Sequence, residues 1–224
     1  MNASRKIVVF GASGRVGSKV CQFARAQKMY VVGVDLAPPK HDFCHQFVQS
    51  DNALQVDLGE ICGVVDFSLP TSTSVVCQLC QKYNCPLVTG TTGRNQDEQN
   101  AIEQLKKCLP VVSKSNFSVG IDCMKKATEF LCKTLPNWKA KLVETHHQNK
   151  VDSPSGTAKC IAKVVESCGI DCPIESIRQG QVFGTHVLTL YTDGQSISIC
   201  HNAENVDIFA QGALNSLAVL LKEN

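Results

Sequence analysis

The stretch Lys6-Ile-Val-Val-Phe-Gly-Ala-Ser-Gly-Arg-Val-Gly-Ser-Lys-Val20 decides the fold of this chain. It begins with an apolar, β-branched run at 6–10, which predicts a short buried strand. Glycines follow at positions 11, 14 and 17, and an apolar helical pattern starts at Val20. A tight strand-to-helix turn of this kind lets the backbone approach a pyrophosphate at the helix N-terminus. The stretch therefore predicts a dinucleotide-binding turn, with an ordinary turn as the alternative.

A second strand and an acidic residue complete this unit. Residues 30–34 form another β-branched run, and Asp35 ends it about 20 residues after the middle glycine. An acid in this place accepts a hydrogen bond from a ribose hydroxyl. The glycine spacing is G-x-x-G-x-x-G instead of the usual G-x-G-x-x-G. Strand, glycines, helix, strand and acid together nevertheless favour dinucleotide binding over an ordinary turn.

Strands and helices continue to alternate as far as residue 113. The apolar patterns predict strands at 64–69, 86–89 and 110–113, and helices at 72–83 and 97–107. This alternation predicts a doubly wound parallel sheet with right-handed crossovers. Ligands of such sheets lie outside the carboxyl ends of the strands. The polar loops 66–68, 90–93 and 114–117 are therefore expected to hold ribose and nicotinamide groups.

The pattern changes after residue 116. A long helix is predicted at 119–134, a strand leads to His146, and Thr192-Asp193-Gly194 predicts a hairpin between strands 185–191 and 195–201. A last apolar helix, 208–221, is expected to return to the first domain. We therefore predict an α/β chain with a Rossmann-type dinucleotide-binding domain at 1–116, completed by 205–224. A second α+β domain with a mixed or antiparallel sheet is predicted at 117–204.

Composition narrows the class of protein. The chain has 224 residues, 43% of them hydrophobic, and a formal charge of +2. This is enough for a full core, and the balanced charge without a basic run predicts neither a nucleic-acid nor a membrane partner. The first residues do not resemble a secretory signal, and no apolar span approaches 18 residues. We therefore expect a cytoplasmic protein.

Thirteen cysteines are scattered through apolar segments, and their number is odd. In a chain without a secretory signal this pattern is typical of reduced, buried thiols. Cys77, Cys80 and Cys85 lack the second pair of ligands that a structural zinc site needs. His41, Cys44 and His45 also have no obvious partners. No metal site is predicted.

The segment Glu144-Thr-His-His-Gln-Asn-Lys-Val-Asp-Ser-Pro-Ser-Gly-Thr-Ala158 concentrates the chemistry of the chain. His146 and His147 end a strand, where successive side chains point to opposite faces. Ser153 and Pro154 predict a helix start, with the proline at the first helical position. The amides of 155–157 would then be available to a carboxylate. Cations and an imidazole beside such a turn indicate a site for an anionic substrate that needs a proton, and a strand end followed by a capped helix is the structural alternative.

These residues resemble the dihydrodipicolinate reductase family over most of the chain. The specific motifs are Glu144-x-His-His-x-x-Lys150-x-Asp-x-Pro-Ser-Gly-Thr-Ala158, Gly90-Thr-Thr-Gly93, Asn116-Phe-Ser-Val-Gly120, Arg178-x-Gly180 and Gly184-x-His186. The resemblance implies a Rossmann-type domain, a mixed-sheet domain that also builds a homotetramer, and a small dicarboxylate substrate. It implies NAD(P)H-dependent reduction of 4-hydroxy-tetrahydrodipicolinate, via dihydrodipicolinate, to tetrahydrodipicolinate in diaminopimelate and lysine biosynthesis.

The resemblance also implies roles for single residues. His146 would be the proton donor and Lys150 a second donor. His147, Gly156 and Thr157 would bind a substrate carboxylate. The NADH or NADPH cofactor would be held by Gly11, Ala12, Ser13, Gly14, Arg15, Val16, Asp35, Gly90, Thr91, Thr92, Lys114, Ser115, Asn116 and Phe117.

Two other functions and the choice between NADH and NADPH remain open to test. A nicotinamide-sensing binding protein would keep the glycine turn but would not need the His-His-x-x-Lys cluster. Another dehydrogenase would usually show a nucleophilic cysteine or an acid–base pair, and none of the cysteines has a recognisable setting. Asp35 repels a 2′-phosphate and Leu36 offers it no cation, whereas Arg15 or Lys40 would favour it. We therefore expect NADH to be used at least as well as NADPH.

Overall fold

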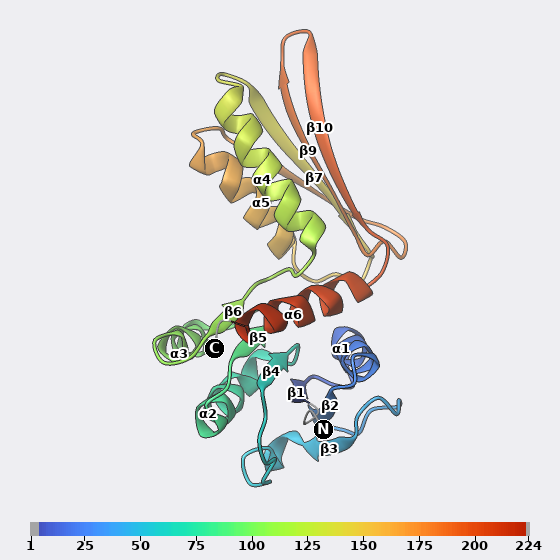
Figure 1. Cartoon of the computed structure of the whole chain (residues 1–224). Coiled ribbons are helices and arrows are strands. Elements are labelled where there is room, and N and C mark those ends of the chain that lie inside the picture. The colour runs from blue at the N-terminus through green and yellow to red at the C-terminus, as the bar shows by residue number, and fades with distance from the viewer. Residues whose placement is uncertain (1–4, 223–224) are drawn as a thin grey trace. The chain divides into compact units, whose positions relative to one another are not determined.

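The computed structural model describes residues 5–222, which form two compact units (Figure 1). The first unit comprises the chain up to Phe117 together with the segment from Phe209 onward, and the second runs from Ser118 to Ile208. No helix within 5–222 is long and apolar enough to cross a membrane.

The first unit is built on a six-stranded parallel sheet in the order β3-β2-β1-β4-β5-β6. This is the strand order of dinucleotide-binding sheets, so the predicted Rossmann-type fold is confirmed. The strands are β1 (Lys6–Phe10), β2 (Tyr30–Asp35), β3 (Gln46–Gln49), β4 (Gly63–Asp66), β5 (Leu87–Thr89) and β6 (Val111–Ser113). The helices are α1 (Arg15–Ala26), α2 (Thr73–Tyr83), α3 (Gln96–Lys106) and α6 (Asp207–Leu220), with short 3-10 turns at Ser50–Asn52 and Pro70–Ser72.

Alternating side chains of the central strand face two helical layers. Val8 and Phe10 of β1 belong to the core under α2 and α3. Ile7 and Val9 belong to the core under α1 and α6. Because β1 is covered on both faces, its buried residues 7–10 are all apolar. Helix α6 thus packs on the first unit.

The second unit has a four-stranded mixed sheet in the order β10-β9-β7-β8. Strands β7 and β8 are parallel, whereas β7 with β9 and β9 with β10 are antiparallel. Figure 1 shows α4 and α5 side by side along this sheet, and their apolar stripes complete its core. The elements are α4 (Val119–Thr134), β7 (Lys139–His146), α5 (Gly156–Ser167), β8 (Ile174–Arg178), β9 (Gly184–Thr192) and β10 (Gln195–Ala203).

Three details differ from the sequence predictions. Strand β4 ends at Asp66 instead of 69, because the Asp66 carboxylate accepts hydrogen bonds from the amide and hydroxyl of Ser68 and turns the chain there. Strands β3 and β8 were not predicted. Both are short, and each lies at an edge of its sheet, where pairing with one neighbour defines it.

Candidate active site

The glycine turn of the first unit joins β1 to α1. Gly11 has φ +74°, and a Cβ there would lie 2.4 Å from the carbonyl oxygen of Phe67. A Cβ on Gly17 would lie 2.0 Å from the Gly11 carbonyl oxygen. Gly14 is the N-cap of α1 and supplies no side-chain cap. The three glycines thus make the turn, open the helix end and let the helix approach the turn closely, which are the roles that pyrophosphate binding requires.

Asp35 stands at the end of β2 beside this turn. Its carboxylate accepts hydrogen bonds from the amides of Ser13 (2.8 Å) and Leu36 (2.8 Å), so it is held against the glycine turn. A cavity of about 380 Å³ opens here. Its lining residues are Gly11, Ser13, Gly14, Asp35, Leu36, Ser50, Phe67, Ser68, Leu69, Thr71 and Ser72. Glycine turn, acid and cavity therefore come together at the carboxyl ends of β1, β2 and β4.

A buried ion pair supports the next strand ends. Arg94 lies 3.1 Å from Asp66, and both side chains are almost fully buried. The hydroxyls of Thr89 (2.7 Å) and Thr91 (2.9 Å) donate to the same carboxylate. Thr91 is therefore turned into the protein, and its hydroxyl is engaged by Asp66 rather than presented to a cofactor.

The other residues predicted to bind the cofactor differ in their solvent exposure. Phe117 is buried and packs edge-on against Phe67, so its side chain belongs to the core. Gly90 lies against the Phe67 ring, where a Cβ would be 2.2 Å away. Ala12 is buried, and Val16, Gly90 and Asn116 are half-buried. The exposed candidates are Ser13, Gly14, Arg15, Thr92, Lys114 and Ser115.

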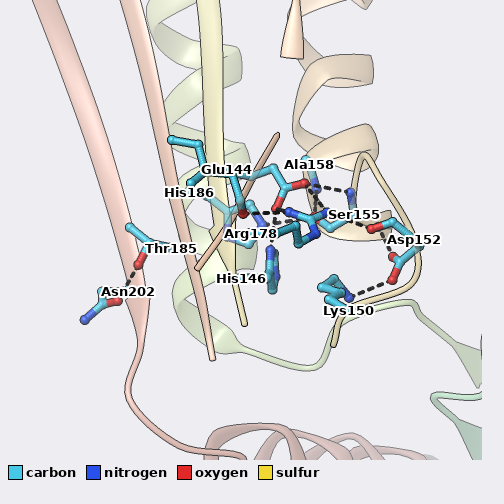
Figure 2. Close-up of polar contacts among 12 residues, drawn as sticks. Glu144, His146, Lys150, Asp152, Ser155, Ala158, Arg178, Thr185, His186 and Asn202 are labelled. Carbon is cyan, nitrogen blue, oxygen red and sulfur yellow. Dashed lines mark hydrogen bonds and ion pairs between the residues drawn. The ribbon is translucent and has the colours of Figure 1, made fainter. Parts of the chain in front are cut away.

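The end of β7 carries the polar cluster of the second unit (Figure 2). Glu144 and His146 lie two residues apart on the face that α4 and α5 cover, and both are buried. His146 Nδ1 hydrogen-bonds the Glu144 carboxylate. Arg178 of the neighbouring strand β8 donates to both carboxylate oxygens, at 3.0 and 2.8 Å. His146 is thus part of a buried network.

Burial and neighbouring charges set the ionisation of this pair. Burial raises the pKa of the Glu144 carboxyl, but hydrogen bonds led by that from Arg178 bring it to about 2. Burial lowers the pKa of His146, the Glu144 hydrogen bond raises it, and the charge of Lys150 lowers it, with a net decrease. Glu144 is therefore a permanent anion, and His146 loses its proton more readily than an exposed histidine.

Lys150 and the start of α5 form an anion-binding corner next to this network. The carboxylate of Asp152 lies 2.9 Å from Lys150 Nζ and accepts the amide hydrogen of Gly156 at 3.2 Å. Figure 2 shows the contact between Lys150 and Asp152. Lys150 and Gly156 can therefore hold one carboxylate together.

The start of α5 differs from the prediction. Ser155 is the N-cap, because its hydroxyl accepts the amide hydrogen of Ala158 at 3.1 Å, so Pro154 lies outside the helix and not at its first position. The Ser155 amide donates to Glu144 at 3.2 Å. The expectation of three free amides at 155–157 is therefore wrong for Ser155, whose amide donates to buried Glu144. The Gly156 amide donates to the exposed carboxylate of Asp152.

Two further histidines tie the sheet to the helix starts. His186 lies opposite Glu144 on β9, and its Nε2 is 3.3 Å from the hydroxyl of Ser155. His201 lies opposite His186 on β10, and its Nε2 is 3.0 Å from the hydroxyl of Ser118, the N-cap of α4. Both N-cap hydroxyls are thus fixed by sheet histidines, which accounts for the histidine of the Gly184-x-His186 motif.

We expect the second unit to lose stability as pH falls from about 6.5 to 4. Burial, with a smaller contribution from the charge of His146, lowers the pKa of His186 from 6.5 to about 4. Between these two pH values the His186 ring binds a proton in the unfolded chain but not in the folded chain. The contribution of neutral His186 to the free energy of unfolding is therefore complete above pH 6.5 and is lost as the pH falls towards 4. The full loss amounts to about 3 kcal/mol.

Urea unfolding followed by the fluorescence of Trp138 measures this loss. Trp138 is the only tryptophan of the chain and packs against the core of the second unit. In His186→Gln the decrease in the free energy of unfolding between pH 6.5 and 4.5 should be clearly smaller than in the unchanged protein. If the free energy of unfolding falls equally with pH in both proteins, groups other than His186 cause the decrease.

The sequence points to His146 and Lys150 as candidate reacting residues, but it does not show which side chains hold them. In the sequence Glu144, Asp152 and Arg178 are only members of motifs, and their contacts are not evident there. The alternation of Glu144 and His146 along one strand was the available signal for the first. Arg178 lies on β8, whose pairing with β7 no pattern predicted, so its approach to Glu144 depends on the fold.

The cysteine and histidine groups considered for metal binding have other contacts. Cys77 and Cys80 lie in the core under α2, and His45 Nδ1 accepts the amide hydrogen of Val31. His41 Nε2 lies 3.0 Å from the carbonyl oxygen of Ala12. All thirteen cysteines are free thiols, and residues 5–222 contain no group of three or more potential metal ligands.

Comparison with known proteins identifies the family of the chain. The model of the N-terminus of dihydrodipicolinate reductase matches residues 5–117, and that of its C-terminus matches 120–224. A 4-hydroxy-tetrahydrodipicolinate reductase of Xanthomonas euvesicatoria is 33% identical over 96% of this chain and 92% of its own length. The dipicolinate-bound dihydrodipicolinate reductase of Paenisporosarcina sp. TG-14 has the same fold, with a TM-score of 0.76 and 19% identity over 98% and 96% of the two chains. GenD2 from gentamicin A biosynthesis, in complex with NAD, shares the fold with a TM-score of 0.67 and 8% identity over 99% and 87%. The chain therefore belongs to the dihydrodipicolinate reductase family.

Proposed function

We propose that the chain reduces 4-hydroxy-tetrahydrodipicolinate, by way of dihydrodipicolinate, to tetrahydrodipicolinate in diaminopimelate and lysine biosynthesis. The observation that carries the proposal is the corner in which Lys150 and the Gly156 amide hold a carboxylate next to the His146 network. The relatives named 4-hydroxy-tetrahydrodipicolinate reductase and the dipicolinate-bound neighbour support the same substrate. The enzyme is an oxidoreductase that depends on a pyridine nucleotide.

The residues of the first unit fit such a cofactor. The turn at Gly11 and Gly14 and the uncapped start of α1 suit a pyrophosphate, and Asp35 suits a ribose. We assign cofactor contacts to the remaining candidates of the family pattern, with Thr91 and Phe117 acting through their backbone. A bound nicotinamide supplies the hydride, and the protein supplies position and charge.

Substrate carboxylates are held by the second unit in this proposal. One carboxylate replaces Asp152 between Lys150 and the Gly156 amide, with Thr157 and His147 completing the site. Asp152 is exposed, so it can turn into solvent when the substrate takes its place. A charge-assisted bond from lysine and a helix-end amide are favourable partners for a carboxylate.

His146 provides the proton. Its Nδ1 faces Glu144, so the proton that it can give away is on Nε2. Reduction of the conjugated ring leaves an electron-rich enamine, which a positioned imidazolium protonates while Lys150 stabilises the nearby negative charge. The lowered pKa of His146 makes this imidazolium a stronger acid than an exposed one.

Turnover with substrate generated in situ tests the proposal directly. The product of condensing pyruvate with aspartate semialdehyde is supplied by a separate synthase, and loss of nicotinamide absorbance at 340 nm is followed. Oxidation of the cofactor should depend on both the synthase and the chain. Absence of turnover by folded protein that binds cofactor would overturn the proposal and favour a nicotinamide-sensing protein.

We further propose that NADH is used at least as well as NADPH. Asp35 lines the cavity and would repel a 2′-phosphate, while the adjacent Leu36 is 62% exposed and offers no charge. Steady-state kinetics with both cofactors measure the preference. Leu36→Arg should raise kcat/KM for NADPH about tenfold relative to NADH, since a charge-assisted hydrogen bond contributes about 1.5 kcal/mol or more. A strong NADPH preference of the unchanged protein would show that Arg15 or Lys40 supplies the cation.

The homotetramer implied by the family resemblance and the cytoplasmic location inferred from the sequence stay predictions. The roles of the two domains also stay predictions. Residues 1–116 and 205–224 are proposed to bind the dinucleotide, and residues 117–204 to bind the substrate and build the oligomer. Sedimentation of the purified chain tests the first of these.

A further inference from the structure

Glu144 is a fully buried carboxylate that the proposed reaction does not use directly. We propose that Glu144, locked in place by Arg178, is the positioning residue that orients His146 and keeps its transferable proton on Nε2. This inference rests on the proposed function, because it gives His146 its working geometry. Glu144 itself touches neither substrate nor cofactor in this proposal.

Two groups besides His146 fix the position of Glu144. Arg178 donates to its two oxygens with two different guanidinium nitrogens, which is the fork geometry that restricts a carboxylate most strongly. The Ser155 amide donates to the same carboxylate at 3.2 Å. Arg178 is in turn held by the carbonyl oxygens of Ile177 (2.8 Å) and Asp152 (2.7 Å). The carboxylate therefore cannot follow the imidazole if the ring moves.

An ionised carboxylate fixes the tautomer of its histidine partner. Glu144 is a permanent anion and can only accept, so His146 Nδ1 must carry a hydrogen. Nε2 is then the nitrogen that gains and loses the second proton. Gly184 lies beside this nitrogen, where a Cβ would be 2.9 Å away, so the glycine of the Gly184-x-His186 motif keeps the space around Nε2 open.

Glu144 also opposes the lowering of the His146 pKa by the surroundings of the ring. Burial and the charges of Lys150 and Arg178 lower the pKa of His146, and His186 packs edge-on against its ring at 5.3 Å. Glu144 is the one carboxylate that raises this pKa among the causes acting on His146. Without its charge the imidazolium would exist only at lower pH.

The test is Glu144→Gln, which keeps the shape but removes the charge. With the coupled turnover assay we expect kcat to fall about 10–100-fold, as loss of such orienting partners does, while KM for the cofactor stays unchanged. A general acid must be protonated, so kcat/KM declines as pH rises through its pKa. In the variant this decline should move to lower pH.

Nuclear magnetic resonance of ¹⁵N-histidine-labelled, full-length protein gives a readout that does not depend on turnover. The neutral ring of His146, assigned through His146→Gln, should carry its hydrogen on Nδ1 in the unchanged protein and shift towards the Nε2 tautomer in Glu144→Gln. Glu175→Gln is the matched control, because Glu175 is an exposed carboxylate on the adjacent strand. It should change neither tautomer nor pH profile.

The outcomes separate this inference from the proposed function. An Nε2 tautomer in the unchanged protein would overturn the inference even if Glu144→Gln fails to fold. An unaltered tautomer, pH profile and kcat in a folded Glu144→Gln would overturn it as well. If the unchanged protein binds cofactor but turns over no substrate, the proposed function falls. The tautomer then decides alone whether Glu144 positions His146.

Discussion

Replacing His146 by glutamine should lower kcat by roughly 10²–10⁴-fold, the loss expected when a general acid is removed. Glutamine is an uncharged polar side chain of similar length, so it fills the buried site without adding a charge. It has no proton to transfer, however. Cofactor affinity should stay unchanged, because His146 belongs to the second unit and the glycine turn to the first. The measurement is steady-state turnover of variant protein that still binds NADH.

Two other variants show whether the loss is specific to proton transfer. Lys150→Ala should raise KM and lower kcat together, because Lys150 both holds a carboxylate and stabilises the reduced ring. Thr157→Val should chiefly raise KM, since the carboxylate it binds changes little along the reaction. Near-normal turnover in both His146→Gln and Lys150→Ala would leave the cluster as a structural network, and the proposed reduction would fall with it.

The fold could be predicted where the pattern is local. Residues 7–10 are all apolar because both faces of β1 are covered, and the α4 bounds follow from its own periodicity. Strands β3 and β8 have no such pattern of their own. Gln46–Gln49 is four residues long with polar ends, and it becomes a strand only by pairing with β2. Edge strands of this kind depend on the partner more than on the sequence.

The site could be predicted as a set of residue types but not as a network. The sequence places His146, Lys150 and the start of α5 close together along the chain. It does not show that Arg178, 34 residues after Glu144, clamps that carboxylate, or that Asp152 fills the Lys150 corner. The Ser155 amide looked available and is instead tied to Glu144. Long-range pairing of β7 with β8 creates the contact between Arg178 and Glu144, and no local pattern encodes this pairing.

The spacing of the glycines in the turn is unusual, but each glycine has the structural role expected of a dinucleotide-binding turn. G-x-x-G-x-x-G departs from the usual pattern, yet Gly11, Gly14 and Gly17 still meet three separate demands. Gly11 needs its positive φ and Gly17 its contact with the Gly11 carbonyl, so a side chain at either would disturb the fold. Gly14 is exposed, and a Cβ there meets only the Gly11 carbonyl oxygen, at 3.1 Å. It is therefore the glycine whose replacement separates binding from folding.

Gly14→Leu should abolish measurable binding of the reduced dinucleotide while leaving the fold largely intact. The side chain would stand in the cavity at the start of α1, where the backbone must approach the pyrophosphate. Losing two charge-assisted hydrogen bonds costs about 3 kcal/mol or more, which is a decrease in affinity on the order of 100-fold.

Titration of NADH fluorescence measures this loss, and far-ultraviolet circular dichroism with thermal unfolding monitors the fold. Ala26→Leu is the matched control, because it adds the same side chain at an exposed position at the other end of α1. The control should bind NADH as the unchanged chain does. If Gly14→Leu also keeps its affinity, the dinucleotide does not rest on this turn, and the assignment of the first unit as the cofactor domain would have to be abandoned.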